Sequence, residues 1–246
     1  AGEKVIYEAA FQFDGVLAAM DMLVKSDEGW KAYEVKSSTS VSDTYKMDAS
    51  LQYYVITNSG IPLKDIAIVH INNQYTKRGE INIQELFTIH SIYEDVMQRL
   101  PSIPRDIKRL KNILSNKQEP SIPIGPHCSS PYTCDFKEHC WQKIPDYSVF
   151  DIKYARGVDW KLYQKGILKT IDIPDDYPLN TRQKIQVSAD KTGDSIIDKK
   201  EISAFLEALQ YPIYHLDFET FSTAVPVYNN SRPYQQLVFQ YSLHKQ

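Results

Sequence analysis

The stretch from Met20 to Ser38, MDMLVKSDEGWKAYEVKSS, constrains the fold more than any other part of the chain. Two runs rich in Val, Leu, Trp and Tyr flank a polar turn that contains a glycine, which is the pattern of a β-hairpin. Asp21, Glu34 and Lys36 lie inside these otherwise apolar strands. Glu34 and Lys36 are two positions apart, so both side chains point to the same face of their strand.

Pairing of the two strands can bring Asp21 beside Glu34. Two carboxylates and an ammonium group then converge, which suits a hard divalent cation next to a phosphate. Charges on a half-exposed hairpin are more often simply solvated, so these three residues alone are a weak signal. Without a metal the two carboxylates would repel each other, and replacing Glu34 by Gln is then expected to stabilise the protein.

The net charge of the chain excludes the class of polycationic proteins that bind nucleic acid with their whole surface. The 246 residues carry 28 Lys and Arg against 31 Asp and Glu, a net charge of −3, so nucleic acid must be held by a local groove or through metal ions. No apolar run approaches the ~20 residues that cross a bilayer, and no signal peptide is present, so we expect no membrane partner and a cytoplasmic protein. A first residue other than Met and an end within a strand-like run indicate a fragment of a longer protein.

Hydrophobic patterning around the hairpin predicts an α/β core. Strands are expected at residues 5–12, 65–72 and 86–92, and helices at 93–100 and 104–114.

A further helix is expected between Ser42 or Asp43, which can cap it, and Gly60. Gln52 lies on this helix, on the same face as Asp48. Four residues at helical spacing are expected to form its buried face: Met47, Leu51, Tyr54 and Val55.

The cysteines of the chain, Cys128, Cys134 and Cys140, follow the spacing C-x5-C-x5-C. An odd count disfavours structural disulfides, and the spacing differs from that of common zinc knuckles. Free buried cysteines and a soft-metal site are the two interpretations, and the crowding favours the second.

Beyond the cysteines, residues 147–208 predict helices with interspersed acids and bases. The run WKLYQKGIL contains a Leu-x-x-x-Gly-Ile turn, read either as part of a helical linker or as a turn that presents N–H groups to phosphate. Near the end, Asp217 and Glu219 point to one face of the strand-like run IYHLDFET. A hydrophobic strand does not bury two carboxylates without a cation or partners.

In combination these motifs resemble the PD-(D/E)XK nuclease superfamily, and within it the RecB-like nucleases and the CRISPR adaptation exonucleases that carry an iron–sulfur cluster. The resemblance implies a restriction-endonuclease-like mixed sheet flanked by helices, with Asp21, Glu34, Lys36 and Gln52 as catalytic residues. Gln52 matches the Gln of a Q-x-x-x-Y motif on that helix. The motif's tyrosine position is occupied by Ile56 here.

The same resemblance implies Mg²⁺ or Mn²⁺ held by Asp21 and Glu34. The carbonyl of Val35 and the carboxylate of Glu8 are further candidate ligands, although a surface strand glutamate is an equally good interpretation of Glu8. Lys36 would orient the attacking water or stabilise the developing charge.

In the resembling nucleases, three C-terminal cysteines and one distant N-terminal cysteine hold a [4Fe–4S] cluster. Cys128, Cys134 and Cys140 would supply three ligands here. No cysteine precedes Cys128, which agrees with a missing N-terminus; His127 or His139 is the other candidate for the fourth ligand.

The strand with Asp217 and Glu219 resembles the first motif of DEDD exonucleases, which have an RNase H-like fold, and implies a metal half-site. The module order is similar to a bacterial family of uncharacterised proteins that fuse the two enzymes. Four parts are therefore expected: a nuclease core (1–118), an iron–sulfur segment (119–146), a helical linker (147–208) and the first strands of an RNase H-like, DEDD-type domain (209–246).

The expected function is metal-dependent hydrolysis of phosphodiester bonds in nucleic acid, DNA in preference to RNA, by an exonuclease of repair or defence. The alternative is a non-catalytic, cluster-stabilised module for nucleic-acid binding or assembly.

Overall fold

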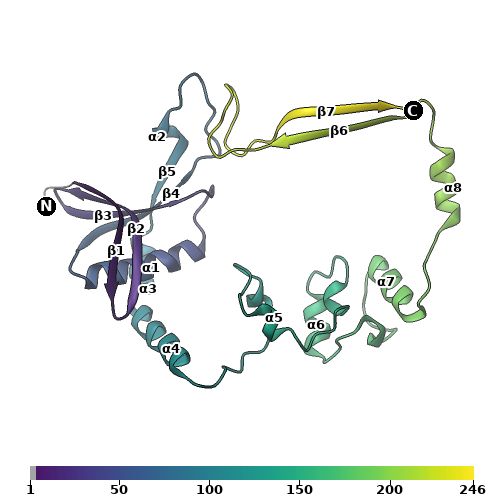
Figure 1. The fold of residues 1–246 in the computed structure, drawn as a ribbon, viewed down its shortest axis with the longest axis horizontal. Helices are drawn as coiled ribbons and strands as arrows, with labels where there is room; N and C mark the ends of the chain where they lie inside the picture. The colour runs from purple at the N-terminus through teal and green to yellow at the C-terminus, as the bar shows by residue number, and fades with distance from the viewer. Residues whose placement is uncertain (1–3) are drawn as a thin grey trace. The chain divides into compact units, whose positions relative to one another are not determined.

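The structure is a computed structural model that describes residues 4–246 (Figure 1). Contacts between residues divide the chain into two units. The first unit contains residues 1–119 and 214–245, and the second contains residues 120–213 and Gln246.

A five-stranded mixed sheet forms the centre of the first unit, in the order β1-β2-β3-β4-β5. Its strands are β1 (Val5–Phe13), β2 (Val16–Ser26), β3 (Gly29–Lys36), β4 (Leu63–Ile71) and β5 (Phe87–Ser91). The predicted hairpin is confirmed as the antiparallel pair β2–β3. Strands β3 and β4 are parallel, and such a pair requires a crossover connection, which helix α1 makes. The chain is thus a mixed α/β protein, as predicted.

Helix α1 (Asp43–Asn58) begins where the sequence predicts it. The Oγ of Ser42 accepts a hydrogen bond from the backbone N–H of Tyr45 at 3.3 Å and caps the first turn. The helix contacts β1, β2 and β4 and therefore covers one face of the sheet.

Of the four residues predicted to form the buried face of α1, Val55 is buried, Leu51 and Tyr54 are partly buried, and Met47 is 62% exposed. The small side chains of Ala49 and Ser50 are fully buried and let the helix backbone lie close to the sheet. The residues that the helix does bury are Ala49, Ser50, Gln52, Tyr53, Val55 and Ile56.

Three shorter helices complete this part: α2 (Ile83–Leu86), α3 (Tyr93–Arg99) and α4 (Ile103–Ser115). Helix α3 contacts α1 and β4. The core between these helices and the sheet consists of Met20, Leu23, Ala32, Ala49, Tyr53, Ile56, Leu63, Ile66, Ile68, Ile92 and Val96.

The second unit has short helices and a small core of its own, which the sequence patterning did not predict. Its helices are α5 (Lys137–Cys140), α6 (Val158–Gln164), α7 (Thr181–Thr192) and α8 (Lys199–Glu207). Its core consists of Val149, Ile152, Leu162, Ile173 and Val187.

The Leu-x-x-x-Gly-Ile turn ends helix α6. Gly166 has a φ of +79°, the N–H of Ile167 donates to the carbonyl of Leu162 at 3.0 Å, and the N–H of Gly166 donates to that of Tyr163 at 2.8 Å. These two bonds form the common glycine end of a helix. Because both N–H groups are used inside the turn, they are not presented to a phosphate.

The C-terminal strands β6 (Tyr214–Phe221) and β7 (Leu237–Lys245) form a separate antiparallel sheet. Within residues 4–246, no helix combines the length and the apolar character needed to span a membrane.

Candidate active site

Asp21 lies where strand β2 departs from regular alternation. Met20 and Leu23 are three positions apart, yet both belong to the same core. On β1, Tyr7 pairs with Met22 and Ala9 pairs with Met20, so Glu8 lies opposite Asp21. Glu8 is exposed and has a left-handed φ of 51°, which is uncommon for a residue with a side chain. Glu8 on β1 is therefore the neighbour of Asp21 across the pair of strands.

The carboxylate of Asp21 reaches across to strand β3. Its Oδ2 accepts a hydrogen bond from the backbone N–H of Val35 at 2.6 Å. The regular pairing of β2 and β3 reaches only to Met22 and Tyr33, so this side chain takes the place of the next backbone partner. The contact ties Asp21 to the backbone of Val35, the residue after Glu34, near the C-terminal end of β3.

Glu34 is a buried carboxylate with two different partners. Glu34 is only 7% exposed. Oε1 accepts a hydrogen bond from Nζ of Lys36 at 2.7 Å, and Oε2 accepts one from Nε2 of Gln52 at 3.3 Å. The structure thus joins three of the four predicted catalytic residues directly, and Asp21 is tied to them through the backbone of Val35.

Lys36 is held among groups that favour its charge. Its Nζ lies 2.7 Å from Oε1 of Glu34 and 3.6 Å from Oδ2 of Asp48, and 5.4 Å from the centre of the Tyr45 ring. Partial burial is the largest single influence and lowers the pKa of Lys36, but Glu34 and Asp48 together outweigh it and raise that pKa above its ordinary value. Lys36 is therefore a cation at neutral pH and cannot act as a general base.

Tyr45 and Asp48 are the neighbours of Lys36 that the sequence interpretation did not place in the site. Together with Gln52 they lie at positions i, i+3 and i+7 of helix α1, which is one helix face. This spacing, next to a catalytic candidate, is the signal in the sequence that would have found them.

Gln52 contributes a buried polar atom without a protein partner. Its Nε2 faces Glu34 and the carbonyl of Ala19, at 3.3 and 3.4 Å, whereas its Oε1 is buried and makes no hydrogen bond among the described residues. A buried, unpaired acceptor is costly unless a water, an ion or a ligand reaches it. Carboxylate and amide oxygens, which Asp21, Glu34 and Gln52 carry, are ligands of the kind that Mg²⁺ or Mn²⁺ prefers.

The protein offers such a cation few carboxylates. No group of three His, Cys, Asp or Glu side chains that could hold a metal gathers in the part of the chain that the structure describes. Glu8 therefore does not complete a trio with Asp21 and Glu34. A site of two carboxylates fits Mg²⁺, which keeps several waters and takes its other ligands from substrate phosphates.

The three cysteines are free and differently placed. Cys128 is buried, whereas Cys134 and Cys140 are exposed. The backbone N–H of Cys134 donates to the carbonyl of Cys128 at 3.0 Å, which folds this segment into a loop. The three thiols do not form a ligand group in this arrangement, so the [4Fe–4S] cluster stays a prediction.

Asp217 and Glu219 lie on β6, which is exposed from Tyr214 to Thr220. Oδ1 of Asp217 accepts a hydrogen bond from the backbone N–H of Phe218 at 2.9 Å. Because both carboxylates are exposed to water, neither one needs a cation to offset the cost of burying its charge. The metal half-site predicted for this pair stays a prediction.

Alkaline pH is expected to destabilise the first unit between about pH 10 and pH 12. Burial, followed by the hydrogen bond and charge of Tyr93, raises the pKa of Tyr53 to about 12, and the pKa of Lys36 is also raised. A group whose pKa is higher in the folded state stabilises fully below its unfolded pKa and loses this effect as pH rises through the folded pKa. Urea unfolding from pH 8 to pH 12 measures the loss.

Tyr53→Phe is expected to flatten this decline, because its ring cannot ionise. Tyr7→Phe, at an exposed tyrosine, is the matched control and should follow the wild type. Parallel declines of the wild type and Tyr53→Phe would contradict the assignment.

Comparison with known proteins gives one partial match. The model of a domain of unknown function, DUF2779, matches residues 214–246. No curated protein and no solved structure matches the chain.

Proposed function

We propose that the chain is a metal-dependent nuclease that hydrolyses phosphodiester bonds of nucleic acid, DNA in preference to RNA. The observation that carries this proposal is the junction of Asp21, Glu34, Lys36 and Gln52 at the C-terminal end of β3. Glu34 contacts Lys36 and Gln52 there, and the backbone N–H of Val35 ties Asp21 to the same end of the strand. The ammonium of Lys36 lies over the ring of Tyr45. This set can hold a cation and a phosphate at the same point.

Asp21 and Glu34 would hold Mg²⁺ or Mn²⁺, with Gln52 as a further oxygen donor. A bound ion of this kind lowers the pKa of a water and neutralises charge on the phosphate. Lys36 supplies a fixed positive charge for the developing oxyanion, because Glu34 and Asp48 keep it protonated and oriented. Asp21 is held in place by the N–H of Val35, so it needs little reorganisation when the substrate arrives.

The proposal includes a finer assignment of the fold and the setting. The mixed sheet with α1 between its parallel strands is compatible with a PD-(D/E)XK, restriction-endonuclease-like core. The β6–β7 pair is compatible with the first strands of an RNase H-like, DEDD-type domain, and Asp217 with Glu219 would be its half-site. A cytoplasmic exonuclease of repair or defence is the setting that this assignment favours.

The decisive experiment is cleavage of end-labelled single-stranded DNA by the chain with Mg²⁺, with Mn²⁺ and with EDTA. Cleavage is expected only with a divalent ion, and Lys36→Ala is expected to lower its rate about 10²–10³-fold, as for the loss of one group that stabilises an oxyanion. Lys46→Ala is the matched control. Its side chain is 24% exposed against 23% for Lys36, and it pairs with Asp95 at 2.8 Å rather than with a residue of the proposed site.

Equal rates for the wild type and Lys36→Ala would rule out catalysis at this site. Binding of DNA without any cleavage would instead support the non-catalytic module.

We further propose that Cys128, Cys134 and Cys140 supply three of the four ligands of a [4Fe–4S] cluster after the loop that carries them rearranges. Protein purified without oxygen is expected to contain iron and acid-labile sulfide, and Cys134→Ser is expected to lose both and to melt at a lower temperature. Ser129→Ala, in the same loop, serves as the control. Stoichiometric zinc without iron would contradict the proposal.

A further inference from the structure

A polar groove of about 630 Å³ lies beside the candidate active site. Three segments line it. Residues 37–40 follow Lys36 directly in the chain, Asn73 and Gln74 follow strand β4, and residues 232–235 come from the loop between β6 and β7. The groove is therefore built from parts of the first unit that are distant in sequence, and it begins at the residue after Lys36.

The loop between β6 and β7 is fixed by hydrogen bonds to the segment between β4 and α2. The N–H of Lys77 donates to the carbonyl of Ser231 at 3.1 Å, and the N–H of Asn230 donates to the carbonyl of Lys77 at 2.8 Å. The N–H of Gly79 donates to Oδ1 of Asn229 at 3.0 Å. Ser231 is buried. This wall of the groove is thus a docked segment rather than a free loop.

A second contact ties the same loop to the segment that carries Lys36. The hydroxyl of Tyr234 donates to the backbone carbonyl of Ser37, the next residue after Lys36. Tyr234 is 38% exposed, so a planar group in the groove can stack on its ring. The segment that the DUF2779 model matches therefore contributes directly to the surroundings of the candidate site.

The lining chemistry selects the class of ligand. Residues 37–40 carry four hydroxyl groups, and the other lining residues add amides, a phenol and the guanidinium of Arg232. Among the residues that the structure describes, no carboxylate lines the groove and none forms an ion pair with the side chain of Arg232. Arginine, hydroxyl and amide groups are the side chains that contact phosphate and sugar in nucleic-acid complexes, and an exposed aromatic ring stacks on the bases of single strands.

We propose that this groove binds the sugar–phosphate backbone of a single nucleic-acid strand, with Arg232 contacting a phosphate, and leads the strand to Lys36. The inference rests on the proposed function and deepens it, because it places the substrate strand at a defined surface. The loop that carries Arg232 and Tyr234 is then a substrate-binding part of the nuclease unit.

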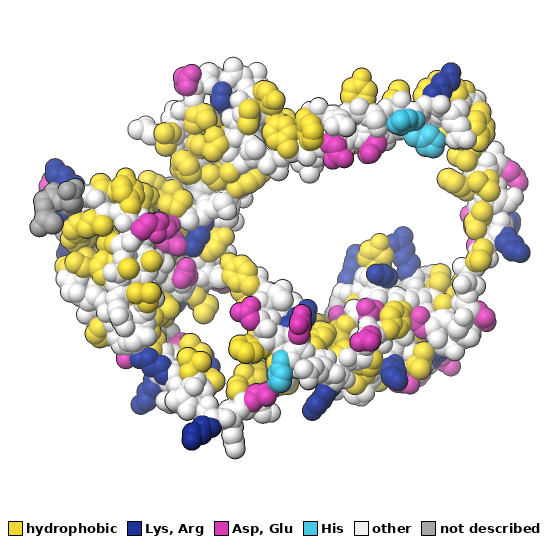
Figure 2. All heavy atoms as spheres, viewed as in Figure 1, with side chains coloured by type: hydrophobic (Ala, Val, Ile, Leu, Met, Phe, Trp, Pro, Cys, Tyr) yellow, Lys and Arg dark blue, Asp and Glu magenta, His cyan; other side chains and the backbone are white. Residues whose placement is uncertain are grey.

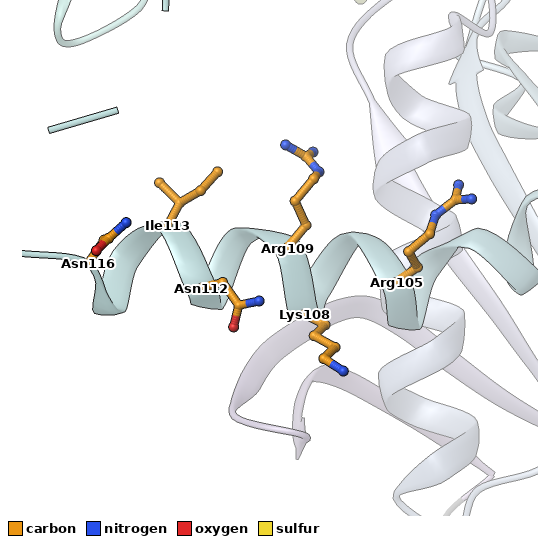
Figure 3. Close-up of a pocket in the computed structure, with 6 residues that line it drawn as sticks. All are labelled: Arg105, Lys108, Arg109, Asn112, Ile113 and Asn116. Atoms are coloured by element: carbon orange, nitrogen blue, oxygen red, sulfur yellow. The ribbon is translucent and has the colours of Figure 1, made fainter. Parts of the chain in front are cut away.

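Helix α4 is the competing basic surface. Figure 3 shows Arg105 and Arg109 on one side of this helix and Lys108 on the other, and Figure 2 shows the Lys and Arg side chains that gather there. Arg109 lies 3.9 Å from Asp106. The charge of α4 is thus divided between two sides and partly neutralised, and no hydroxyl or aromatic ring lines that surface, so the groove is the better fit to a strand.

The test measures binding of a fluorescein-labelled single-stranded oligothymidylate to the chain in EDTA, by fluorescence anisotropy over a range of salt concentrations. Arg232→Ala is expected to weaken binding about tenfold at low salt and to reduce the slope of log K against log salt by about 0.7, the loss of one phosphate contact. Arg232→Lys is expected to retain the slope. Arg105→Ala is the matched control and should bind within twofold of the wild type, a limit set by the loss of one exposed charge.

Unchanged affinity and slope in Arg232→Ala, an equal loss in Arg105→Ala, or no binding by the wild type would each overturn the inference. The two proposals fail separately. If Arg232→Ala binds like the wild type while cleavage still depends on Lys36, the groove assignment falls and the nuclease stands. If Arg232→Ala weakens binding and no divalent ion produces cleavage, the groove stands and the nuclease falls.

Discussion

Glu34→Gln is expected to lower the rate of divalent-dependent DNA cleavage by about 10²–10³-fold. It is also expected to lower the free energy of unfolding by about 1–3 kcal/mol, because it leaves buried polar groups with a poorer partner. Glu34 is the one candidate ligand that contacts both Lys36 and Gln52. Its replacement by the neutral isostere removes a negative charge from the proposed cation site and leaves the shape of the side chain unchanged.

The sign of the stability change separates two descriptions of this site. From the sequence, repulsion between Asp21 and Glu34 predicts that Glu34→Gln stabilises the metal-free protein. In the structure Glu34 is 2.7 Å from the Lys36 ammonium and accepts from Gln52, while Asp21 is bound by a backbone N–H. Removal of one partner from a charge pair that is shielded from water destabilises because the other charge stays behind, and this pair is partly buried. The expected sign is therefore reversed.

Urea unfolding in EDTA measures the change in the free energy of unfolding. Isothermal titration calorimetry of the variant with Mn²⁺ measures the loss of metal binding. Glu28→Gln is the control, since it makes the same chemical change in the same hairpin. The side chain of Glu28 is exposed, and its ion pair with Lys31 is a long one, with 3.8 Å between Oε2 and Nζ. It should alter stability by less than about 0.5 kcal/mol. Cleavage by Glu34→Gln at the wild-type rate would exclude Glu34 as a ligand.

The sequence predicts the hairpin well because its information is local. Alternation of side chains, a glycine-containing turn and the two-residue spacing of Glu34 and Lys36 depend on neighbours in the chain. The face that α1 turns to the sheet depends instead on contacts with residues distant in the chain. Large apolar residues such as Met47 suggest the buried face, but the small Ala49 decides it by allowing close approach to the sheet.

Other parts of the site are tertiary and have no signal in the sequence. The unpaired Oε1 of Gln52 is recognised only when its surroundings are complete. The contact between Tyr234 and Ser37 joins residues 197 positions apart, and no spacing rule connects them. The groove beside Lys36 was missed for the same reason.

The core of the second unit escaped the sequence analysis for a different reason. Its members come from short helices and 3₁₀ turns, so no run is long enough to show a helical period. Val149 begins a 3₁₀ turn (Val149–Asp151) and Ile173 directly follows another (Thr170–Asp172), so neither one belongs to an α-helix. The interspersed charges of the segment predict a solvated linker instead.

Leu162→Ala is expected to destabilise this second core by about 2–5 kcal/mol, the usual cost of removing a buried leucine side chain. Leu162 is 0% exposed and is one of only five buried residues in the cluster. Its carbonyl also accepts the N–H of Ile167 at the end of α6, so the cavity lies beside the turn that closes the helix. A small core has few other contacts to compensate, and whole domains are stable by only about 5–15 kcal/mol.

Hydrogen exchange of backbone amides resolves the effect. The N–H of Val149, which donates to the carbonyl of Leu168 at 2.9 Å, is expected to lose protection in Leu162→Ala, whereas the amides of β4 keep theirs. Ile171→Ala, at an exposed isoleucine of the same unit, is the matched control and should exchange like the wild type. If Leu162→Ala leaves the protection of Val149 unchanged, residues 147–208 have no cooperative core and behave as the linker that the charge pattern predicts. If β4 loses protection equally, the two units unfold together and the second core is not an independent source of stability.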